Sequence, residues 1–409
     1  MPHLFGPSAT DRHPLQILQP AGPTQCVVEA PNCPASVGDR PSATGEKARG
    51  TQYPDAVKIL YGVVGEGMGH AIRSRVVLDH LLACGHEVTI MASSRAADYL
   101  ARRYAQVRRI HGFHIIYEDN RVRKGKTLLS NAIAGTAALP KQVRSYFRLV
   151  EDFAPNAVIS DFESWTYFYG KAHRLPIFSI DNMQALHRCR HPPELLKGIR
   201  RDFEMARALV KSKMLRCDHY IITSFFGAPV RKPNTTMVPP ILRPEILSAQ
   251  ATTGDHVLVY QTAEGHDALP RALADWGIPC RVYGMRRKLT ADVCEGTLTY
   301  RPFDEAQFIA DLASARAVIS GGGFTLLGEC VYLKKPTLTI PVLGQVEQVL
   351  NSRYMEREGY GMAADHVGLE QLQRFEANLP RYAENLSRYY QEGNAQVFAT
   401  LDALLDRVL

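Results

Sequence analysis

The stretch Val57–His70 reads VKILYGVVGEGMGH, an apolar run that leads into a glycine-rich turn. The run at 57–64 predicts a buried strand, and Ala71–Cys84 has the spacing of a helix. Glycines permit positive φ and a close approach to a ligand, and a helix N-terminus offers unpaired N–H groups to an anion. A histidine at the end of such a loop is a candidate general base. A plain strand-to-helix turn with an incidental histidine explains the stretch equally well.

The rest of the chain continues the same alternation of strands and helices. Strands are predicted at Val57–Val64, His86–Ala92, Arg109–Tyr117, Ala157–Ser160, Pro176–Ile180, His219–Ser224, His256–Gln261, Pro279–Tyr283, Thr297–Tyr300, Ala317–Ser320 and Thr337–Ile340. Helices are predicted between them, the clearest at Ile72–Ala83, Leu128–Phe153, Glu194–Leu215, Asp267–Trp276, Glu305–Ala313, Phe324–Leu333, Val346–Glu358, Leu369–Ala377 and Pro380–Val408. We therefore expect an α/β protein with two doubly wound, Rossmann-like domains that face each other across a cleft.

Composition divides the chain into four parts. Residues 1–54 are rich in Pro, Ser and Gly without periodicity, which indicates a disordered N-terminal extension. The first domain is expected at 55–226 and the second at 245–409, with a terminal helix. Five prolines in 227–244 indicate a linker between them.

Charge and cysteine usage restrict the function. Residues 56–240 carry 28 Lys/Arg and 15 Asp/Glu, a net charge of +13, so this half favours an anionic partner over a merely solvated surface. The eight cysteines form no C-x-x-C motif, which argues against a zinc or redox site. No apolar run reaches transmembrane length and no secretory signal is evident, so we expect a cytoplasmic protein.

The second half contains the stronger ligand-binding signal. Ser320-Gly-Gly-Gly-Phe-Thr325 follows a predicted strand and opens a predicted helix, an arrangement that binds phosphate oxygens through backbone N–H groups. Glu329 lies less than two turns into that helix, within reach of a ribose hydroxyl. Gln345, Gln348 and Asn351 follow the next strand and are suited to sugar hydroxyls; a loop with a solvated helix face is the alternative interpretation.

These motifs resemble those of the GT-B nucleotide-sugar glycosyltransferases. G-x-G-x-G-H at 65–70, S-G-G-G…G-E at 320–329 and P…Q-x-x-N at 341–351 occur in that family's order, and the resemblance spans about 57–405. The chain is similar to the UDP-glycosyltransferases and to the lipid-linked N-acetylglucosaminyltransferase of peptidoglycan synthesis. The resemblance implies no cofactor; the nucleotide sugar, expected to be a UDP-sugar, is a substrate.

The resemblance assigns donor-binding roles in the second domain. By the resemblance, the diphosphate is bound by Ser320, Gly321, Gly322, Gly323 and Thr325, and the ribose is bound by Glu329. The donor sugar falls to Gln348 and Asn351, with Gln345 and Glu347 adjacent. Phe303 is placed beside the uracil, and the loop 260–265 (YQTAEG) resembles a second diphosphate loop but lacks its usual Gly-Gly-Ser character.

The first domain would bind the acceptor. In plant-type members a loop histidine is the general base and an aspartate orients it, roles that fall to His70 and Asp161. Glu66 and Asp181 are rivals for either role, and an N-cap is the commoner use of such an Asp. Gly65, Gly67 and Gly69 complete the acceptor-side loop.

The motifs also bear on mechanism and partners. No D-x-D triplet occurs, so we expect no metal, and attack from a base opposite the leaving group predicts inversion. Basic clusters, including Arg121–Lys126 and Lys197–Arg216, suit an anionic or lipid-linked acceptor and peripheral attachment to an anionic membrane; for the helical segment alone, packing on the core is the stronger interpretation. A sugar-nucleotide epimerase and a non-catalytic sugar-nucleotide-binding subunit are alternatives, whereas nothing predicts nucleic-acid binding.

Overall fold

The fold is that of a computed structural model. It describes residues 56–65, 67–110, 117–118, 121–122, 146–148, 150–262, 268–342 and 344–408. The predicted extension 1–54, Glu66 and most of the predicted helix 128–153 lie outside the described residues, as does most of the basic loop 121–126.

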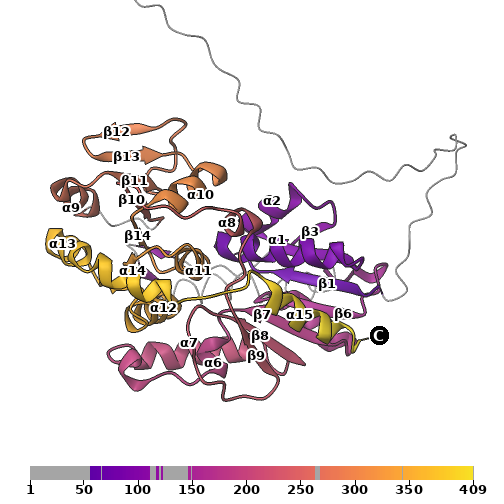
Figure 1. Ribbon diagram of the computed structural model, residues 1–409. Coiled ribbons are helices and arrows are strands. Elements are labelled where there is room, and N and C mark those ends of the chain that lie inside the picture. The colour runs from indigo at the N-terminus through magenta and orange to yellow at the C-terminus, as the bar shows by residue number, and fades with distance from the viewer. Residues whose placement is uncertain are drawn as a thin grey trace, which may run out of the picture. The chain divides into compact units, whose positions relative to one another are not determined.

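Seven parallel strands form the first sheet, in the order β3-β2-β1-β6-β7-β8-β9 (Figure 1). They are β1 (Lys58–Val63), β2 (Glu87–Ser93), β3 (Val107–Ile110), β6 (Ala157–Asp161), β7 (Ile177–Asp181), β8 (His219–Thr223) and β9 (Thr235–Val238). From β1 the chain builds outward to β3 on one side and, through β6, to β9 on the other. The strand order therefore reverses between β1 and β6, and ligands of such sheets bind at the carboxyl ends of the strands at this point.

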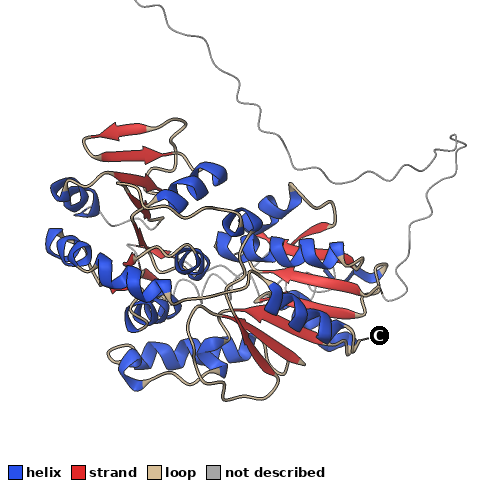
Figure 2. Cartoon of the chain, in the orientation of Figure 1, coloured by secondary structure: helices blue, strands red, loops and turns tan. Residues whose placement is uncertain are grey.

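The helices of this half connect the strands. They are α1 (Met68–Ala83), α2 (Ser94–Ala101), α5 (Ser164–His173), α6 (Ala185–Arg188), the 3₁₀ helix η1 (Pro193–Leu196) and α7 (Arg200–Lys213). A two-stranded antiparallel pair, β4 (Tyr117–Glu118) and β5 (Arg121–Val122), stands apart from the sheet. Figure 2 shows helices on either side of the strands. With helices covering it, the sheet is buried, and its strands are accordingly near-continuous apolar runs.

The second sheet has the order β12-β13-β11-β10-β14-β15-β16. Its strands are parallel except for the edge strand β12, which pairs antiparallel with β13. Its strands are β10 (Val257–Tyr260), β11 (Cys280–Tyr283), β12 (Val293–Glu295), β13 (Leu298–Arg301), β14 (Ala317–Ser320), β15 (Thr337–Thr339) and β16 (Gly361–Ala363). Its helices are α8 (Pro244–Leu247), α9 (Ala268–Trp276), α10 (Glu305–Ser314), α11 (Phe324–Tyr332), α12 (Val346–Arg357), α13 (Leu369–Ala377) and α14 (Leu379–Ser387). The strand order reverses between β10 and β14. The predicted α/β fold with two parallel-sheet domains is confirmed.

Several boundary predictions differ from the structure. The predicted helix Glu194–Leu215 is η1 followed by α7, and in place of the predicted strand Arg109–Tyr117 the structure has β3, which spans Val107–Ile110. The proline-rich segment 227–244 is not wholly a linker, because β9 within it pairs with β8 and completes the first sheet. The predicted terminal helix 380–408 is two helices, α14 and α15 (Ala395–Leu405). Buried Val397 and Leu401 of α15 join the core of the first sheet, beside which Figure 1 shows this yellow helix. The last helix of the chain therefore belongs with the first domain.

Helix α15 is also tied to α1 by polar and aromatic contacts. Nε2 of His80 lies 2.7 Å from Oδ1 of Asp402, and the imidazole stacks on Phe398 with ring centroids 4.0 Å apart.

Among the described residues, no helix has both the length and the apolar character that crossing a bilayer requires.

Candidate active site

The loop after β1 passes close to the second half of the chain. Helix α1 begins at Met68 with Gly67 as its N-cap at φ 86°, a left-handed conformation that favours glycine. A Cβ on Gly69 would lie 2.5 Å from Oγ1 of Thr325 in α11. A side chain at Gly69 would therefore push the loop away from α11, so this glycine permits the approach. Gly65 is similarly confined, since its Cβ would lie 2.6 Å from the backbone oxygen of Ser93.

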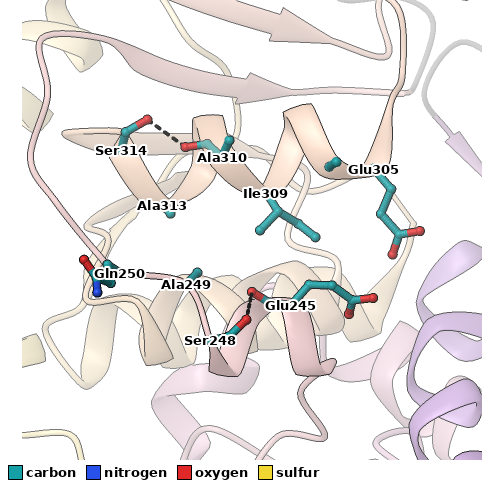
Figure 3. Close-up of a pocket in the computed structure, with 10 residues that line it drawn as sticks. Glu245, Ser248, Ala249, Gln250, Glu305, Ile309, Ala310, Ala313 and Ser314 are labelled. Carbon is teal, nitrogen blue, oxygen red and sulfur yellow. Dashed lines mark hydrogen bonds between the residues drawn. The ribbon is translucent and has the colours of Figure 1, made fainter. Parts of the chain in front are cut away.

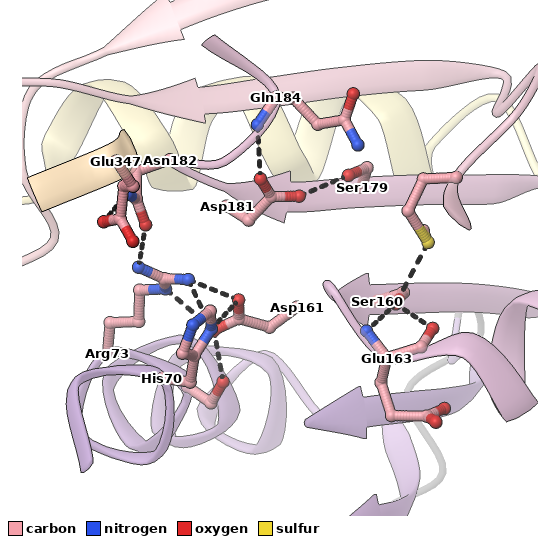
Figure 4. Close-up of polar contacts among 12 residues, drawn as sticks. His70, Arg73, Ser160, Asp161, Glu163, Ser179, Asp181, Asn182, Gln184 and Glu347 are labelled. Carbon is pink, nitrogen blue, oxygen red and sulfur yellow. Dashed lines mark hydrogen bonds and ion pairs between the residues drawn. The ribbon is translucent and has the colours of Figure 1, made fainter. Parts of the chain in front are cut away.

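His70 and Asp161 meet at the point where the first sheet reverses its strand order. His70 lies in the first turn of α1, and Asp161 ends β6. Nδ1 of the imidazole is 2.8 Å from Oδ1 of the carboxylate (Figure 4). Asp161 is buried, whereas the His70 side chain keeps 16% of its surface exposed. The structure thus brings together the two residues that the resemblance pairs, and their catalytic roles remain predictions.

Arg73 is a third member of this cluster and was missed from the sequence. Its Nε donates to Oδ2 of Asp161 at 2.8 Å and its Nη2 to Oδ1 at 2.5 Å, a bidentate pair. Nη2 also lies 2.6 Å from Nδ1 of His70. The signal was available, because residues three apart on a helix share a face and Arg73 follows His70 by three.

The charges in the cluster keep Asp161 ionised. Burial by itself raises the pKa of this carboxyl, but the positive charge of Arg73 and then the interaction with His70 bring it down to about 2. Ser74 adds a hydrogen bond from Oγ to Oδ2 at 3.1 Å. An ionised Asp161 can accept a hydrogen bond from a protonated Nδ1 of His70, and this bond holds the imidazole in place.

Asn182 extends the cluster from the first half of the chain to the second. Its Oδ1 accepts from Nη1 of Arg73 at 2.6 Å, and its Nδ2 donates to Oε1 of Glu347 at 2.6 Å. Glu347 lies in the first turn of α12 and accepts also from Asn351, at 3.3 Å. Nδ2 of Asn351 in turn lies 3.2 Å from the backbone oxygen of Gly322. A chain of hydrogen bonds thus joins the His70 cluster to the glycine loop.

Asp181, a rival for the role of base or orienter, is used in a turn. Its Oδ2 accepts from Oγ of Ser179 at 2.7 Å, and its Oδ1 accepts from the backbone N–H of Gln184 at 2.8 Å. Burial raises the pKa of this carboxyl. Both carboxylate oxygens are thus used within this turn, and the N-cap of the following helix α6 is Gln184 rather than Asp181. Glu66, the other rival, lies outside the described residues.

The glycine loop lies where the second sheet reverses its strand order. Ser320 ends β14, and Gly322 adopts φ 80° before α11 begins at Phe324. No side chain caps the N-terminus of α11, so its first N–H groups are open to an anion. The buried amide of Gln261 stands beside the loop, with its Oε1 3.2 Å from where a Cβ on Gly321 would lie. Nε2 of Gln261 has no hydrogen-bond partner among the described residues.

Three other residues predicted to bind the donor differ in their exposure and contacts. Phe303 is 60% exposed and stands near Phe308, with ring centroids 5.6 Å apart. Gln348 turns its Oε1 to the backbone N–H of Val342 at 3.0 Å and so holds the loop before α12, while Gln345 is the N-cap position of that helix. The roles of Phe303, Gln345 and Gln348 in donor binding therefore remain predictions.

Glu329 is engaged more fully than the prediction assumed. Both of its oxygens accept from Arg243, at 2.8 and 2.9 Å, and Glu329 is 1% exposed. Arg243 also donates from Nη1 to Glu305 at 2.7 Å. A ribose hydroxyl would have to share this carboxylate with Arg243, so Glu329 as a ribose ligand stays a prediction.

Two further features lie apart from this cluster. In the described part of the chain, His80, Cys84 and Asp402 bring ligand-type atoms within 4.8 Å of one another. His80 is ten residues along α1 from His70, about 15 Å by the helical rise. A groove between α8 and α10, lined by Glu245, Ser248, Glu305 and Ile309 among others, contains none of the predicted site residues (Figure 3).

A scan of family models places the chain. The model of glycosyl transferase family 1 matches residues 57–380, both sheets and both loops included. The chain belongs to glycosyl transferase family 1. It is therefore a glycosyltransferase, as the motifs led us to expect.

Two curated relatives of this glycosyltransferase differ in how much they share with it. An uncharacterized glycosyltransferase of Methanosarcina mazei is 24% identical over 343 residues, which cover 75% of this chain and 85% of the relative. A UDP-N-acetylglucosamine–N-acetylmuramyl-(pentapeptide) pyrophosphoryl-undecaprenol N-acetylglucosamine transferase of Bacillus cereus is 29% identical over 110 residues, 25% of this chain and 30% of the relative.

A solved structure supports the fold. LpCGTa in complex with UDP superposes with a TM-score of 0.58 at 16% identity, covering 86% of this chain and 99% of that one. At this identity the likeness concerns the fold alone, and it confirms the GT-B arrangement of the glycosyltransferase.

Proposed function

We propose that this glycosyltransferase transfers a sugar, with inversion and without a metal, from a UDP-sugar to a hydroxyl group of a lipid-linked, cell-envelope or small-molecule acceptor. The observation that carries the proposal is the 2.8 Å contact between His70 and an ionised, buried Asp161. A carboxylate on Nδ1 leaves Nε2 of the imidazole free to receive a proton.

The proposed step is a single displacement. Nε2 of His70 takes the proton of the acceptor hydroxyl while its oxygen forms a bond to the anomeric carbon. The bond from that carbon to the β-phosphate oxygen breaks, and UDP leaves with the electron pair. Attack opposite the leaving group inverts the anomeric centre. Asp161 stabilises the imidazolium that forms and is not itself protonated.

The donor side supplies positive potential where the leaving diphosphate develops charge. Backbone N–H groups at Gly321–Gly323 and the open N-terminus of α11 point to an anion site. The unpartnered amide of Gln261 adds a donor at the same place. With these donors in place, we propose that no divalent cation is required. Phe303 offers an exposed ring for the uracil.

The names of similar proteins support a UDP-sugar donor and a phosphorylated acceptor. The LpCGTa structure contains UDP, and the Bacillus cereus relative carries UDP-N-acetylglucosamine and a pyrophosphoryl-undecaprenol acceptor in its name. The basic first half is compatible with an acceptor that bears phosphate.

The test is transfer from a panel of UDP- and GDP-sugars to lipid-linked and soluble acceptors, with and without EDTA. We expect UDP release, an inverted product by NMR, no effect of EDTA, and loss of transfer in His70→Ala with donor binding nearly unchanged. A retained anomeric configuration, or wild-type turnover in His70→Ala, would remove this mechanism.

Helix α7 supplies the proposed membrane contact. Phe203 and Val210 are buried, which confirms that one face of this helix packs on the core. Met205 and Leu209 are 48% and 63% exposed and, four residues apart, share another face beside several Lys and Arg residues. Co-sedimentation with vesicles that contain anionic lipid should fall in Met205→Ser/Leu209→Ser and at high salt. Binding that ignores lipid charge would contradict it.

A further inference from the structure

The contacts around His70 are compatible with a proton on either ring nitrogen, and the proposed mechanism requires the proton on Nδ1. Nδ1 of His70 lies 2.8 Å from Oδ1 of Asp161 and 2.6 Å from Nη2 of Arg73. If Nδ1 carries the proton, it donates to Asp161 and Nε2 is free to act as a base. If Nδ1 is bare, it accepts from Arg73, the proton resides on Nε2, and His70 cannot take a proton from the acceptor. An arginine is always a donor, so its position decides between the two tautomers.

Arg73 has a further contact through its other terminal nitrogen. Its Nη1 donates to Oδ1 of Asn182, whose Nδ2 donates to Glu347 on α12. The carboxylate therefore sets the orientation of the Asn182 amide, and this orientation presents an oxygen to the guanidinium. Arg73 and Asn182 are 3% and 6% exposed, so the contacts are little screened by solvent.

Glu347 stands next to the donor loop. It shares Nδ2 of Asn351 with the backbone oxygen of Gly322, within the glycine turn that leads to α11. Glu347 and Asn182 therefore connect the donor loop to Arg73 by hydrogen bonds. Figure 4 shows Glu347, Asn182 and Arg73 in series towards Asp161 and His70.

We propose that Arg73 is a positioning residue which Asn182 and Glu347 draw towards the donor side, so that Nδ1 of His70 keeps its proton and Nε2 stays basic. The inference rests on the proposed function, in which His70 is the base. It assigns to Asn182 and Glu347 the coupling between the donor site and the base.

The decisive variant is Asn182→Ala, which breaks the series without removing a charge or touching His70. Its matched control is Asn394→Ala, another buried asparagine whose amide bonds both backbone groups of Leu242, at 2.9 and 2.7 Å, far along the chain from the cluster. The tautomer is read by ¹⁵N NMR of histidine-labelled protein with UDP bound, and the His70 signals are those missing in His70→Gln.

In wild type and Asn394→Ala we expect the proton on Nδ1. In Asn182→Ala we expect a measurable fraction on Nε2, a kcat lower by about 2- to 30-fold, and an unchanged donor KM. Glu347→Ala should lower kcat similarly, and the double variant should lose no more than either single one, because both act on one path.

The proposal is overturned if Asn182→Ala keeps the wild-type tautomer and kcat, if Asn394→Ala matches its losses, or if the two losses add. Failure of the proposed function looks different. If the proposed function is wrong, the wild-type enzyme transfers no sugar or His70→Ala retains turnover. The tautomer of His70 measured by NMR still shows in that case whether Asn182 and Glu347 control the position of Arg73.

Discussion

Each half of the molecule buries a carboxylate against an arginine, and the two pairs differ in what else the carboxylate touches. Asp161 accepts from Arg73 at 2.8 and 2.5 Å, and Glu329 accepts from Arg243 at 2.8 and 2.9 Å. Asp161 keeps His70 as a further partner, and that imidazole is partly exposed. Glu329 has no such partner among the described residues. A buried ion pair is thus common to both halves, and the partly exposed imidazole of His70 distinguishes the pair for which we propose a catalytic role.

The surroundings move the two pKa values in opposite directions. Burial raises the pKa of Asp161, but Arg73 and His70 outweigh it and lower the value to about 2. For Glu329, burial raises the pKa beyond what Arg243 offsets, and the charges of Glu305 and Glu245 add to the rise. The first site therefore favours a charged carboxylate and the second does so less, which suits a catalytic orienter and a structural contact respectively.

The largest expected difference is in catalysis. Asp161→Asn removes the carboxylate that orients His70, so kcat should fall by about 10²–10⁴-fold, the usual contribution of general-base catalysis. Glu329→Gln keeps an acceptor of the same shape, so we expect kcat within about tenfold of wild type. Transfer kinetics at saturating donor measure both. Equal losses of kcat would contradict the comparison, whereas a raised donor KM in Glu329→Gln would support the predicted ribose contact.

The next difference is in stability. Arg243→Met leaves two carboxylates, Glu329 and Glu305, without their buried partner, which should cost about 3–5 kcal/mol of unfolding free energy. Arg73→Met should cost less, about 1.5–3 kcal/mol, because Asp161 retains its contacts with Ser74 and His70. Urea unfolding at neutral pH measures both values. Glu329→Leu combined with Arg243→Met should recover part of the loss, and a larger cost for Arg73→Met would reverse the ranking.

The sequence revealed much of this arrangement because its signals are local. Apolar runs such as 57–64 and 317–320 are buried on both faces of a sheet and so leave a continuous pattern in the chain. The glycines at 65–69 and 321–323 mark turns by their backbone freedom. His70 follows β1 and Asp161 ends β6, and adjacent parallel strands bring their carboxyl ends together.

What the sequence did not reveal depends on contacts between distant segments. Arg73 pairs with a residue 88 positions away, and Asn182 with one 165 positions away. β9 sits in a proline-rich stretch whose pairing with β8 no periodicity indicates. α15 packs on the first sheet although it follows the second, and its apolar face is the same whichever core receives it. Tertiary partners, and not local pattern, decided these cases.

The third difference is in the response of stability to acid. The folded pKa of Asp161 is about 2, below the ordinary 3.8, so the unfolded chain binds the proton first as pH falls. Its stabilisation is present above about pH 4 and is lost towards pH 2, on the order of 2 kcal/mol. Glu329 has the opposite sign, because its raised pKa favours the folded, protonated form as pH falls.

Unfolding by urea between about pH 6 and pH 2 should therefore show a shallower acid loss in Asp161→Asn than in wild type. In Glu329→Gln the acid loss should be at least as steep, because a group that gains stability on protonation has been removed. Parallel pH curves for wild type and Asp161→Asn would show that the carboxyl does not titrate with folding.

The smallest expected difference concerns the exposed aromatic rings of the two halves. Phe303 is 60% exposed, and Phe308, Tyr260 and Tyr283 surround it at centroid distances of 5.6 to 6.5 Å. This support leaves a ring surface on which a uracil can stack. Phe168 in α5 is 46% exposed but lies on the other sheet. Phe303→Ala should weaken UDP binding by about 1 kcal/mol, roughly fivefold in Kd, the lower end for base stacking.

Calorimetric titration with UDP measures the effect, with Phe168→Ala as the matched loss of an exposed ring and Phe303→Trp as a variant that keeps an aromatic face. We expect Phe168→Ala to bind as wild type does and Phe303→Trp to retain most of the affinity. If Phe303→Ala binds UDP normally, the base lies elsewhere along the second sheet.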